Sequence, residues 1–188
     1  MSHTTKKVVV LVGSLRQASY HRMIANTLAE LAPANMTIEI LPSIGDIPHY
    51  DSDVQTAGFP ASVSALGAAI KAADGVIIVT PEYNYSIPGV LKNAIDWLSR
   101  LPEPPFAGKA LAIQSASMGA LGGSRVQYHL RQTLVFLDAM VLNKPEIMVG
   151  TIQNKVDAAS GKVTDADTRT YISKQLVALD ALIEKLAA

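Results

Sequence analysis

The feature that most constrains this chain is a series of short, nearly continuous apolar runs that alternate with longer helical patterns. Residues 7–12, 75–80 and 109–115 are rich in Val, Ile, Leu and Ala with few interruptions. Strands have this composition when helices cover both faces of a parallel sheet. Two further strands are predicted at residues 37–41 and 146–149.

Helical patterns fill most of the intervals. In the third of them, Leu91, Ala94, Ile95 and Leu98 share one face, and prolines follow from position 102. Helices are predicted at residues 20–32, 61–73, 89–100, 122–140 and 165–186. Strand–helix units with right-handed crossovers predict an α/β fold, a three-layer sandwich around a five-stranded parallel sheet. We expect one domain over residues 1–188, with a long loop at 42–60.

Composition excludes several classes of protein. The chain has no cysteine, so disulfides, thiolate metal sites and thiol redox chemistry are ruled out. Lys+Arg and Asp+Glu both number 16, and no basic stripe is present, so no nucleic-acid partner is expected. No apolar run is long enough to insert into a membrane, and the polar start does not resemble a secretory signal. We expect a cytoplasmic protein. His49 lies among aspartates without a defined ligand spacing, so no metal site is predicted.

The loop after the first strand has groups that suit an anion. Gly13 is expected to let the backbone turn sharply through its flexible φ, and a helix begins a few residues later. Ser14, Ser19 and Tyr20 offer hydroxyl donors, and Arg16 or Arg22 offers a charged donor. A phosphate at the helix N-terminus would be favoured by the helix dipole. Taken alone, the loop fits equally well a helix capped by Ser19.

Two more loops follow the third and fourth strands, at residues 80–89 and 115–123. The first contains tyrosines and prolines, and the second is rich in glycine. Carboxyl ends of parallel strands lie at one edge of the sheet, where ligands of such folds bind. The three loops together predict a site for a flat, phosphorylated cofactor.

The same residues carry a family resemblance. The motif GSLRQASYHR at 13–22 and the run PEYNYSIPGVLKNAIDWLSR at 81–100 resemble the NAD(P)H-dependent FMN reductases, which are flavodoxin-like proteins. The stretch SMGALGG at 117–123 and the segment at 125–146 are similar to bacterial soluble quinone and chromate reductases. The resemblance covers nearly the whole chain and implies a flavodoxin-like fold and FMN as cofactor.

By resemblance, the FMN contacts can be assigned to individual positions. The phosphate contacts are Ser14, Arg16, Ser19, Tyr20 and His21. The contacts to the ring and ribityl chain are Pro81, Glu82, Tyr83, Asn84, Tyr85, Ser117, Met118 and Gly119.

Two residues depart from the family pattern, Ala18 in place of glycine and His21 in place of asparagine. Alanine disfavours a left-handed backbone. An imidazole that faces phosphate is favoured in its charged form, so FMN affinity is predicted to weaken as pH rises through the His21 pKa. A solvated His21 at the helix start is the alternative.

The resemblance also implies the reaction. NADH or NADPH passes a hydride to flavin N5, and in a second, ping-pong step quinones are reduced by two electrons, with chromate and ferric complexes as further acceptors. No catalytic side chain is required. Donors at residues 117–120 would stabilise the reduced flavin. Tyr83 and Tyr85 are expected to bound the substrate slot, with ordinary loop packing as the alternative.

Arg125, Tyr128 and His129 share a helix face. Similarity to homotetrameric reductases predicts an interface of a dimer of dimers that includes Arg125 and Tyr128, with Glu146 as the partner of Arg125. An exposed polar helix face is the alternative.

Two other functions stay open, a flavodoxin-type electron carrier and a non-enzymatic nucleotide-binding protein. The balanced charge disfavours the carrier, because such carriers are usually strongly acidic.

Overall fold

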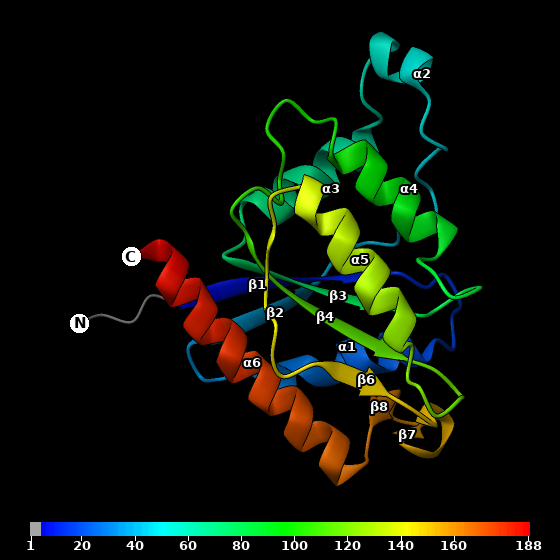
Figure 1. Cartoon of the computed structure of the whole chain (residues 1–188), viewed down its shortest axis with the longest axis vertical. Helices are drawn as coiled ribbons and strands as arrows, with labels where there is room; N and C mark the ends of the chain where they lie inside the picture. Colours follow the sequence, from blue (N-terminus) through cyan, green and yellow to red (C-terminus); the bar gives the residue numbers. More distant parts are fainter. Residues whose placement is uncertain (1–4) are drawn as a thin grey trace.

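The computed structural model describes residues 5–188 (Figure 1). Its main sheet has the order β2-β1-β3-β4-β5, and β6 also pairs with β4. Every pairing in this sheet is parallel. The strands are β1 (Lys6–Val12), β2 (Met36–Ile40), β3 (Gly75–Thr80), β4 (Ala110–Ala116), β5 (Met140–Val141) and β6 (Ile147–Val149). The predicted α/β, flavodoxin-like fold is confirmed.

Helices cover both faces of the sheet, which explains the unbroken apolar strands. All residues of β3 and β4 are buried. One core layer packs the sheet against α3 (Ala61–Lys71), α4 (Gly89–Leu98) and α5 (Ser124–Phe136). The other packs it against α1 (Tyr20–Leu31) and α6 (Ala166–Ala187), which lie on the opposite side of the sheet in Figure 1. No helix of residues 5–188 has the length and apolar character needed to cross a bilayer.

The outer strand next to β4 is interrupted. β5 pairs with the start of β4 and β6 with its end, and residues 142–146 run between them. The predicted strand at 146–149 matches β6, whereas the predicted helix at 122–140 is too long. α5 ends at Phe136 because the chain turns at Asp138, whose φ is 54° and whose carbonyl accepts a hydrogen bond from Gly108 N at 2.8 Å.

Between β5 and β6, side chains donate the hydrogen bonds that bind the backbone of the outer strand. The guanidinium of Arg131 donates to the Leu142 carbonyl (2.9 Å), and the amide of Gln175 donates to the Pro145 carbonyl (2.8 Å). Gln127 Nε2 donates to the Ile147 carbonyl at 2.7 Å, where β6 begins. These donors hold the interrupted edge in place, since a carbonyl left without a partner away from water would be costly.

Besides β5, four short elements were not predicted. α2 (Ser52–Ala57) lies within the segment 42–60, buries none of its residues, and projects from the body of the molecule (Figure 1). The others are the 3-10 helix η1 (Ile152–Asn154) and the hairpin of β7 (Val156–Asp157) and β8 (Lys162–Val163). The hairpin docks on α1, where Val163 N donates to Thr27 Oγ1 at 2.9 Å.

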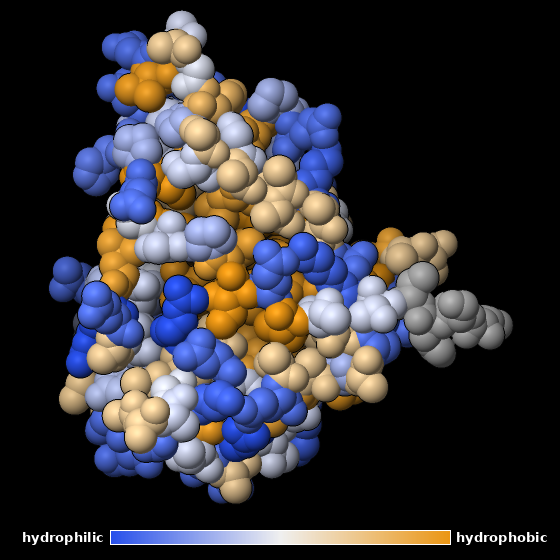
Figure 2. Space-filling model, turned by 180° about the vertical axis from the view of Figure 1, so that it is seen from behind, coloured by the Kyte–Doolittle hydropathy of each residue, from blue (hydrophilic) through white to orange (hydrophobic). Residues whose placement is uncertain are grey.

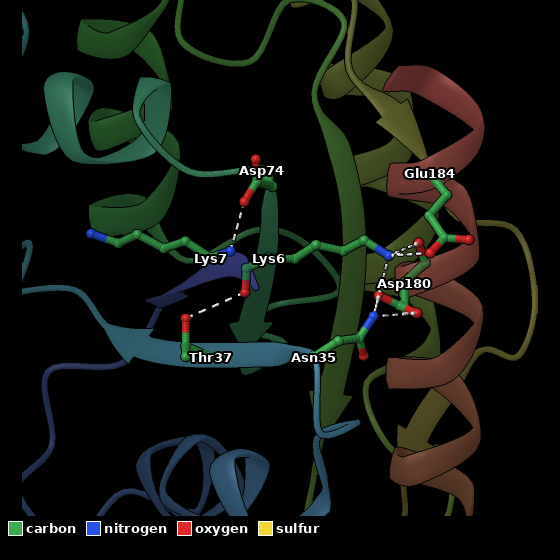
Figure 3. A network of polar contacts seen from close by, with 7 residues as sticks. All are labelled: Lys6, Lys7, Asn35, Thr37, Asp74, Asp180 and Glu184. Atoms are coloured by element: carbon green, nitrogen blue, oxygen red, sulfur yellow. Dashed lines mark hydrogen bonds and ion pairs between the residues drawn. The ribbon is translucent and has the colours of Figure 1, made fainter. Parts of the chain in front are cut away.

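At the edge of the sheet opposite the three loops, polar contacts attach α6 to β1 (Figure 3). Lys6 Nζ lies 2.5 Å from Asp180 Oδ1 and 2.8 Å from Glu184 Oε1. Asn35 Nδ2 also donates to Asp180, at 3.1 Å. Lys6 and Asp180 are largely buried, so these polar contacts replace much of the water that would otherwise stabilise the two charges.

The molecule seen from behind shows hydrophobic side chains at the surface near its middle (Figure 2). A groove of about 240 Å³ runs between the end of β2 and α3. Its walls are mostly apolar and come from Leu41, Pro42, Ile47, Ala65, Leu66 and Ala69, with polar residues at the margin.

Candidate flavin site

The loops that follow β1, β3 and β4 meet at one cavity of about 300 Å³. Parallel strands end together, which brings segments from distant parts of the sequence to the same edge. The walls are formed by Ser14, Arg16, Ser19, Tyr20, His21, Pro81, Glu82, Tyr83, Ala116, Ser117 and Met118. Asn84, Tyr85 and Gly119, which were also assigned to the cofactor, are next to these residues in sequence but do not line the cavity. Ala116 was missed, because a backbone carbonyl leaves no mark in the sequence.

The first loop offers unused donors. Among residues 5–188, no acceptor takes a hydrogen bond from the backbone N–H groups of residues 14–20. Ser19 caps α1, its Oγ accepting from His21 N at 3.2 Å and Arg22 N at 3.4 Å. Ser19 therefore caps α1, as the sequence allowed. This role is compatible with an anion site, because the N-terminus of α1 faces the cavity with its positive dipole end and free N–H groups.

The backbone of this loop is not left-handed at Gly13 or at Ala18. Gly13 does not have a positive φ. It is required for space instead, since a Cβ there would lie 2.8 Å from Thr80 Oγ1, on the neighbouring strand. Ala18 has no positive φ either, so alanine at this position causes no strain.

His21 differs from its expected state. Its side chain is 7% exposed, and Nε2 lies 3.1 Å from the Ala116 carbonyl, to which it donates. Burial lowers the pKa of His21 to about 4, although the hydrogen bond to Ala116 opposes the shift. The ring is therefore neutral at pH 7, and the predicted loss of FMN affinity at rising pH loses its basis. His21 ties the start of α1 to the end of β4.

The second loop contains a tight turn. Tyr83 and Ser86 exchange backbone hydrogen bonds of 3.1 and 3.0 Å, and the residues between them, Asn84 and Tyr85, have φ of 50° and 68°. Positive φ at both central positions is the geometry of a type I′ turn. Tyrosine rarely adopts it, and such strain collects at functional sites.

The side chains of α5 hold this turn. The Arg125 guanidinium lies 3.9 Å from the centroid of the Tyr85 ring, within the range of a cation–π contact. One turn further along α5, His129 Nδ1 lies 3.0 Å from Ser86 Oγ. Both tyrosines remain more than half exposed, Tyr83 at 54% and Tyr85 at 63%, and Tyr83 presents its ring surface to the cavity.

Glu82 lies between the turn and α5. One carboxylate oxygen accepts hydrogen bonds from Arg125 N (2.9 Å) and Val126 N (3.1 Å), and the other pairs with Arg125 Nη1 (3.2 Å). Within the chain, the carboxylate partner of Arg125 is thus Glu82, whereas the expected pair of Arg125 with Glu146 is one between protomers. Glu146 is exposed just before β6, beside a shallow groove that also contains Lys155 and Tyr171.

The third loop is shaped by two glycines. Gly122 and Gly123 have φ of 61° and 77°. A Cβ at Gly122 would lie 2.5 Å from the Met148 carbonyl carbon on β6, so this glycine allows the loop to pack against the sheet edge. At Gly119 nothing lies closer than 3.9 Å to such a Cβ, and Met118 is 61% exposed. The loop therefore presents open backbone and one apolar side chain to the site.

These features fit FMN. The donors at the start of α1, together with Arg16, suit a dianionic phosphate. Exposed Tyr83 and Met118 offer apolar surface to a flat ring, while the N–H groups of residues 118–120 donate to no acceptor within residues 5–188. The latter are available to the polar edge of the ring.

Comparison with known proteins agrees with this geometry. The family model for NADPH-dependent FMN reductase matches residues 6–154. A quinone reductase of Escherichia coli is 60% identical over 181 residues, and an NAD(P)H-dependent FMN reductase of Pseudomonas aeruginosa is 50% identical over 180, each match spanning 96% of both chains. The structure of FerB, a flavoenzyme NAD(P)H:(acceptor) oxidoreductase from Paracoccus denitrificans, superposes with a TM-score of 0.86 at 36% identity, covering 96% of this chain and 98% of FerB. The chain therefore belongs to the NADPH-dependent FMN reductase family, a family of flavin-dependent oxidoreductases.

Proposed function

We propose that this protein uses FMN to transfer two electrons from NADH or NADPH to quinones. The observation that carries the proposal is the convergence of three loops on one cavity, in a chain that is 60% identical to a quinone reductase over 96% of its length. Bound FMN supplies the capacity to accept a hydride and to pass two electrons on. The protein's task is to bind, orient and shield that cofactor.

The phosphate end is proposed to lie at the loop after β1. The N–H groups of residues 14–20 and the guanidinium of Arg16 would neutralise the phosphate, and Ser14 and Tyr20 would add hydroxyl donors. His21, being neutral and bound to Ala116, serves to hold α1 against β4. This arrangement predicts tighter binding of FMN than of riboflavin, which lacks the phosphate.

The ring end is proposed to lie between the turn at 83–86 and the loop at 117–120. The N–H groups of the latter would stabilise negative charge that develops on the ring as it is reduced. Tyr83 and Tyr85 would bound the slot in which the nicotinamide and then the quinone bind, one after the other. The stiff turn keeps both rings in place, since α5 holds it through Arg125 and His129.

Chromate and ferric complexes are proposed as further acceptors, because an open slot bounded by exposed tyrosines does not require a planar substrate. Like the quinone, they would receive electrons from the reduced cofactor after the nicotinamide has left.

Anaerobic titration tests the proposal. Purified protein loaded with FMN is expected to bleach fully with one equivalent of NADH or NADPH and to recover its yellow colour with one equivalent of benzoquinone. Arg16→Gln is expected to weaken FMN binding about tenfold without changing riboflavin binding. Persistence of a one-electron-reduced flavin and slow turnover with quinone would instead identify an electron carrier, and absence of flavin binding would refute both functions.

We further propose that the chain assembles as a homotetramer through α5 and its surroundings. Large apolar side chains are exposed on this helix, with Phe136 at 80%, Val135 at 78% and Tyr128 at 57%. Exposed apolar surface of this kind is typical of protein interfaces. Arg125 and Glu146 would complete the contact between protomers. In sedimentation velocity, Tyr128→Ala and Glu146→Gln are expected to shift tetramers toward dimers, and unchanged tetramers in both variants would contradict this interface.

A further inference from the structure

Two side chains of α4, Asn93 and Trp97, bind the same backbone carbonyl. Asn93 Nδ2 donates to the Pro48 carbonyl at 2.9 Å, and Trp97 Nε1 donates to it at 2.8 Å. The two residues are one helical turn apart and share a face of α4. Asn93 Oδ1 also accepts a hydrogen bond from Tyr50 N at 2.8 Å. The backbone at 48–50 is therefore bound to α4 through both a donor and an acceptor.

Aromatic contacts extend this attachment. The Tyr50 ring meets Trp97 edge-on at 5.1 Å between centroids, and the Phe59 ring does so at 6.2 Å. Trp97 is fully buried, while α2, which lies between these two aromatic residues in sequence, buries none of its own side chains. The projecting part of the segment 42–60 is thus anchored to the body at both ends by one tryptophan.

The other part of the segment reaches the first cofactor loop. Ile44 and Ile47 are buried in the core layer of α3 and α4. Gly45, between them, lies against Leu15, so closely that a Cβ at Gly45 would be 3.1 Å from Leu15 Cδ2. Leu15 belongs to the loop at 13–18 and is 48% exposed, so the backbone around Gly45 supports it from one side.

We propose that Asn93 and Trp97 are positioning residues for the cofactor phosphate. By fixing the backbone at 48–50 they set the path of the segment 42–50, and through Gly45 and Leu15 they hold the loop at 13–18 in its binding conformation. A loop that is ordered before the ligand arrives binds more tightly, because less conformational entropy is lost on binding. The inference rests on the proposed placement of the FMN phosphate at this loop.

Equilibrium binding to the apoprotein tests the inference, with quenching of flavin fluorescence as the readout. Trp97→Phe keeps an aromatic ring and removes the N–H donor, and Asn93→Leu keeps the branched shape of the side chain and removes the hydrogen bonds of its amide. Each is expected to raise the dissociation constant of FMN about fivefold to tenfold and to leave that of riboflavin unchanged. Lys92→Gln is the matched control, because Lys92 lies on the exposed side of α4 and pairs, among residues 5–188, only with Asp96. This variant is expected to bind FMN as the wild type does.

Hydrogen exchange provides a readout that does not depend on flavin. In Trp97→Phe and Asn93→Leu, backbone amides are expected to exchange faster both at 42–50 and at 13–18. Faster exchange confined to 42–50, or a lowered melting temperature with an unchanged ratio of FMN to riboflavin affinity, would overturn the inference and leave the two residues a purely structural role. A wild-type protein that binds riboflavin as tightly as FMN would instead refute the proposed phosphate site itself.

Discussion

The carboxylate of Glu82 takes the place of an N-cap side chain for α5, accepting hydrogen bonds from the backbone N–H groups of Arg125 and Val126 at 2.9 and 3.1 Å. The residue at the N-cap position itself is Gly123, which has no side chain to offer. A residue of the β3 loop thus completes a helix more than forty positions later, and the turn at 83–86 and α5 become one unit. The family resemblance assigns Glu82 to the flavin contacts; Glu82 lines the cavity, and its carboxylate also holds the wall of the site together.

Replacing Glu82 should therefore affect stability first. Glu82→Ala is expected to lower the free energy of unfolding by about 1–2 kcal/mol, because two N–H groups lose their acceptor and the helix dipole loses a negative charge. Glu82→Gln keeps an acceptor oxygen, so its free energy of unfolding should fall by about half as much. Chemical denaturation of the apoprotein measures both. Wild-type stability in Glu82→Ala would show that the carboxylate does not cap α5.

His21 predicts a pH dependence of folding. Its pKa is about 4 in the folded protein, as burial disfavours the charged ring, and near 6.5 when unfolded. A folded-state pKa below the unfolded value contributes stability that is present above pH 6.5 and is lost as the pH falls from 6.5 toward 4. The loss amounts to about 3 kcal/mol between pH 7 and pH 4.

The corresponding experiment compares the wild type with His21→Asn across this pH range. The variant lacks the titrating ring, so the difference between the two stability curves isolates His21 from the carboxylates that titrate nearby. The difference in unfolding free energy between the two proteins is expected to be constant above pH 7 and to change steadily between pH 6.5 and 4. Parallel curves throughout would mean that His21 has an ordinary pKa in the folded protein.

The glycine-rich loop allows a comparison of two identical substitutions. Gly122→Ala places a Cβ 2.5 Å from the carbonyl carbon of Met148, at a residue whose φ is +61°, so the loop must move away from β6. We expect a loss of about 3–5 kcal/mol in unfolding free energy. Gly119→Ala meets nothing within 3.9 Å and should fold as the wild type does. Equal stabilities of the two variants would contradict the packing of this loop.

The layers of the fold could be predicted from sequence because burial on both faces leaves a local signal. The runs at 75–80 and 109–115 are apolar almost throughout, and only a covered parallel strand explains that pattern. β5, β7 and β8 have two residues each, too few for any periodicity to show. The end of α5 was misplaced because Leu137, Ala139 and Met140 continue the apolar pattern past the end of the helix, on both sides of the turn at Asp138.

The sequence allowed the three loops of the site to be predicted, but not the contacts that their residues make. Motif and strand order place three loops at one edge, and the structure brings them to one cavity. The charge state of His21, however, depends on the carbonyl of Ala116, 95 positions away, and on the burial that this contact creates. The turn at Asn84 and Tyr85 has positive φ without any glycine, so its shape has no local signature and depends on Arg125 and Ser86.

The contact between Lys6 and Asp180 predicts a stability effect remote from the flavin site (Figure 3). Their side chains are only 12% and 18% exposed, so Asp180→Ala removes the more buried of the two carboxylates that pair with Lys6, leaving Glu184, and also removes the acceptor of Asn35. We expect a loss of about 1–3 kcal/mol in unfolding free energy.

The neighbouring pair of Lys7 and Glu39 is about half exposed, and Glu39→Gln should lower the unfolding free energy by less than about 1 kcal/mol. FMN affinity should stay unchanged in both variants, since neither Asp180 nor Glu39 lines the cavity formed by the three loops. Urea denaturation at low and high salt distinguishes the two pairs, and an equal loss in both variants would contradict the role of burial.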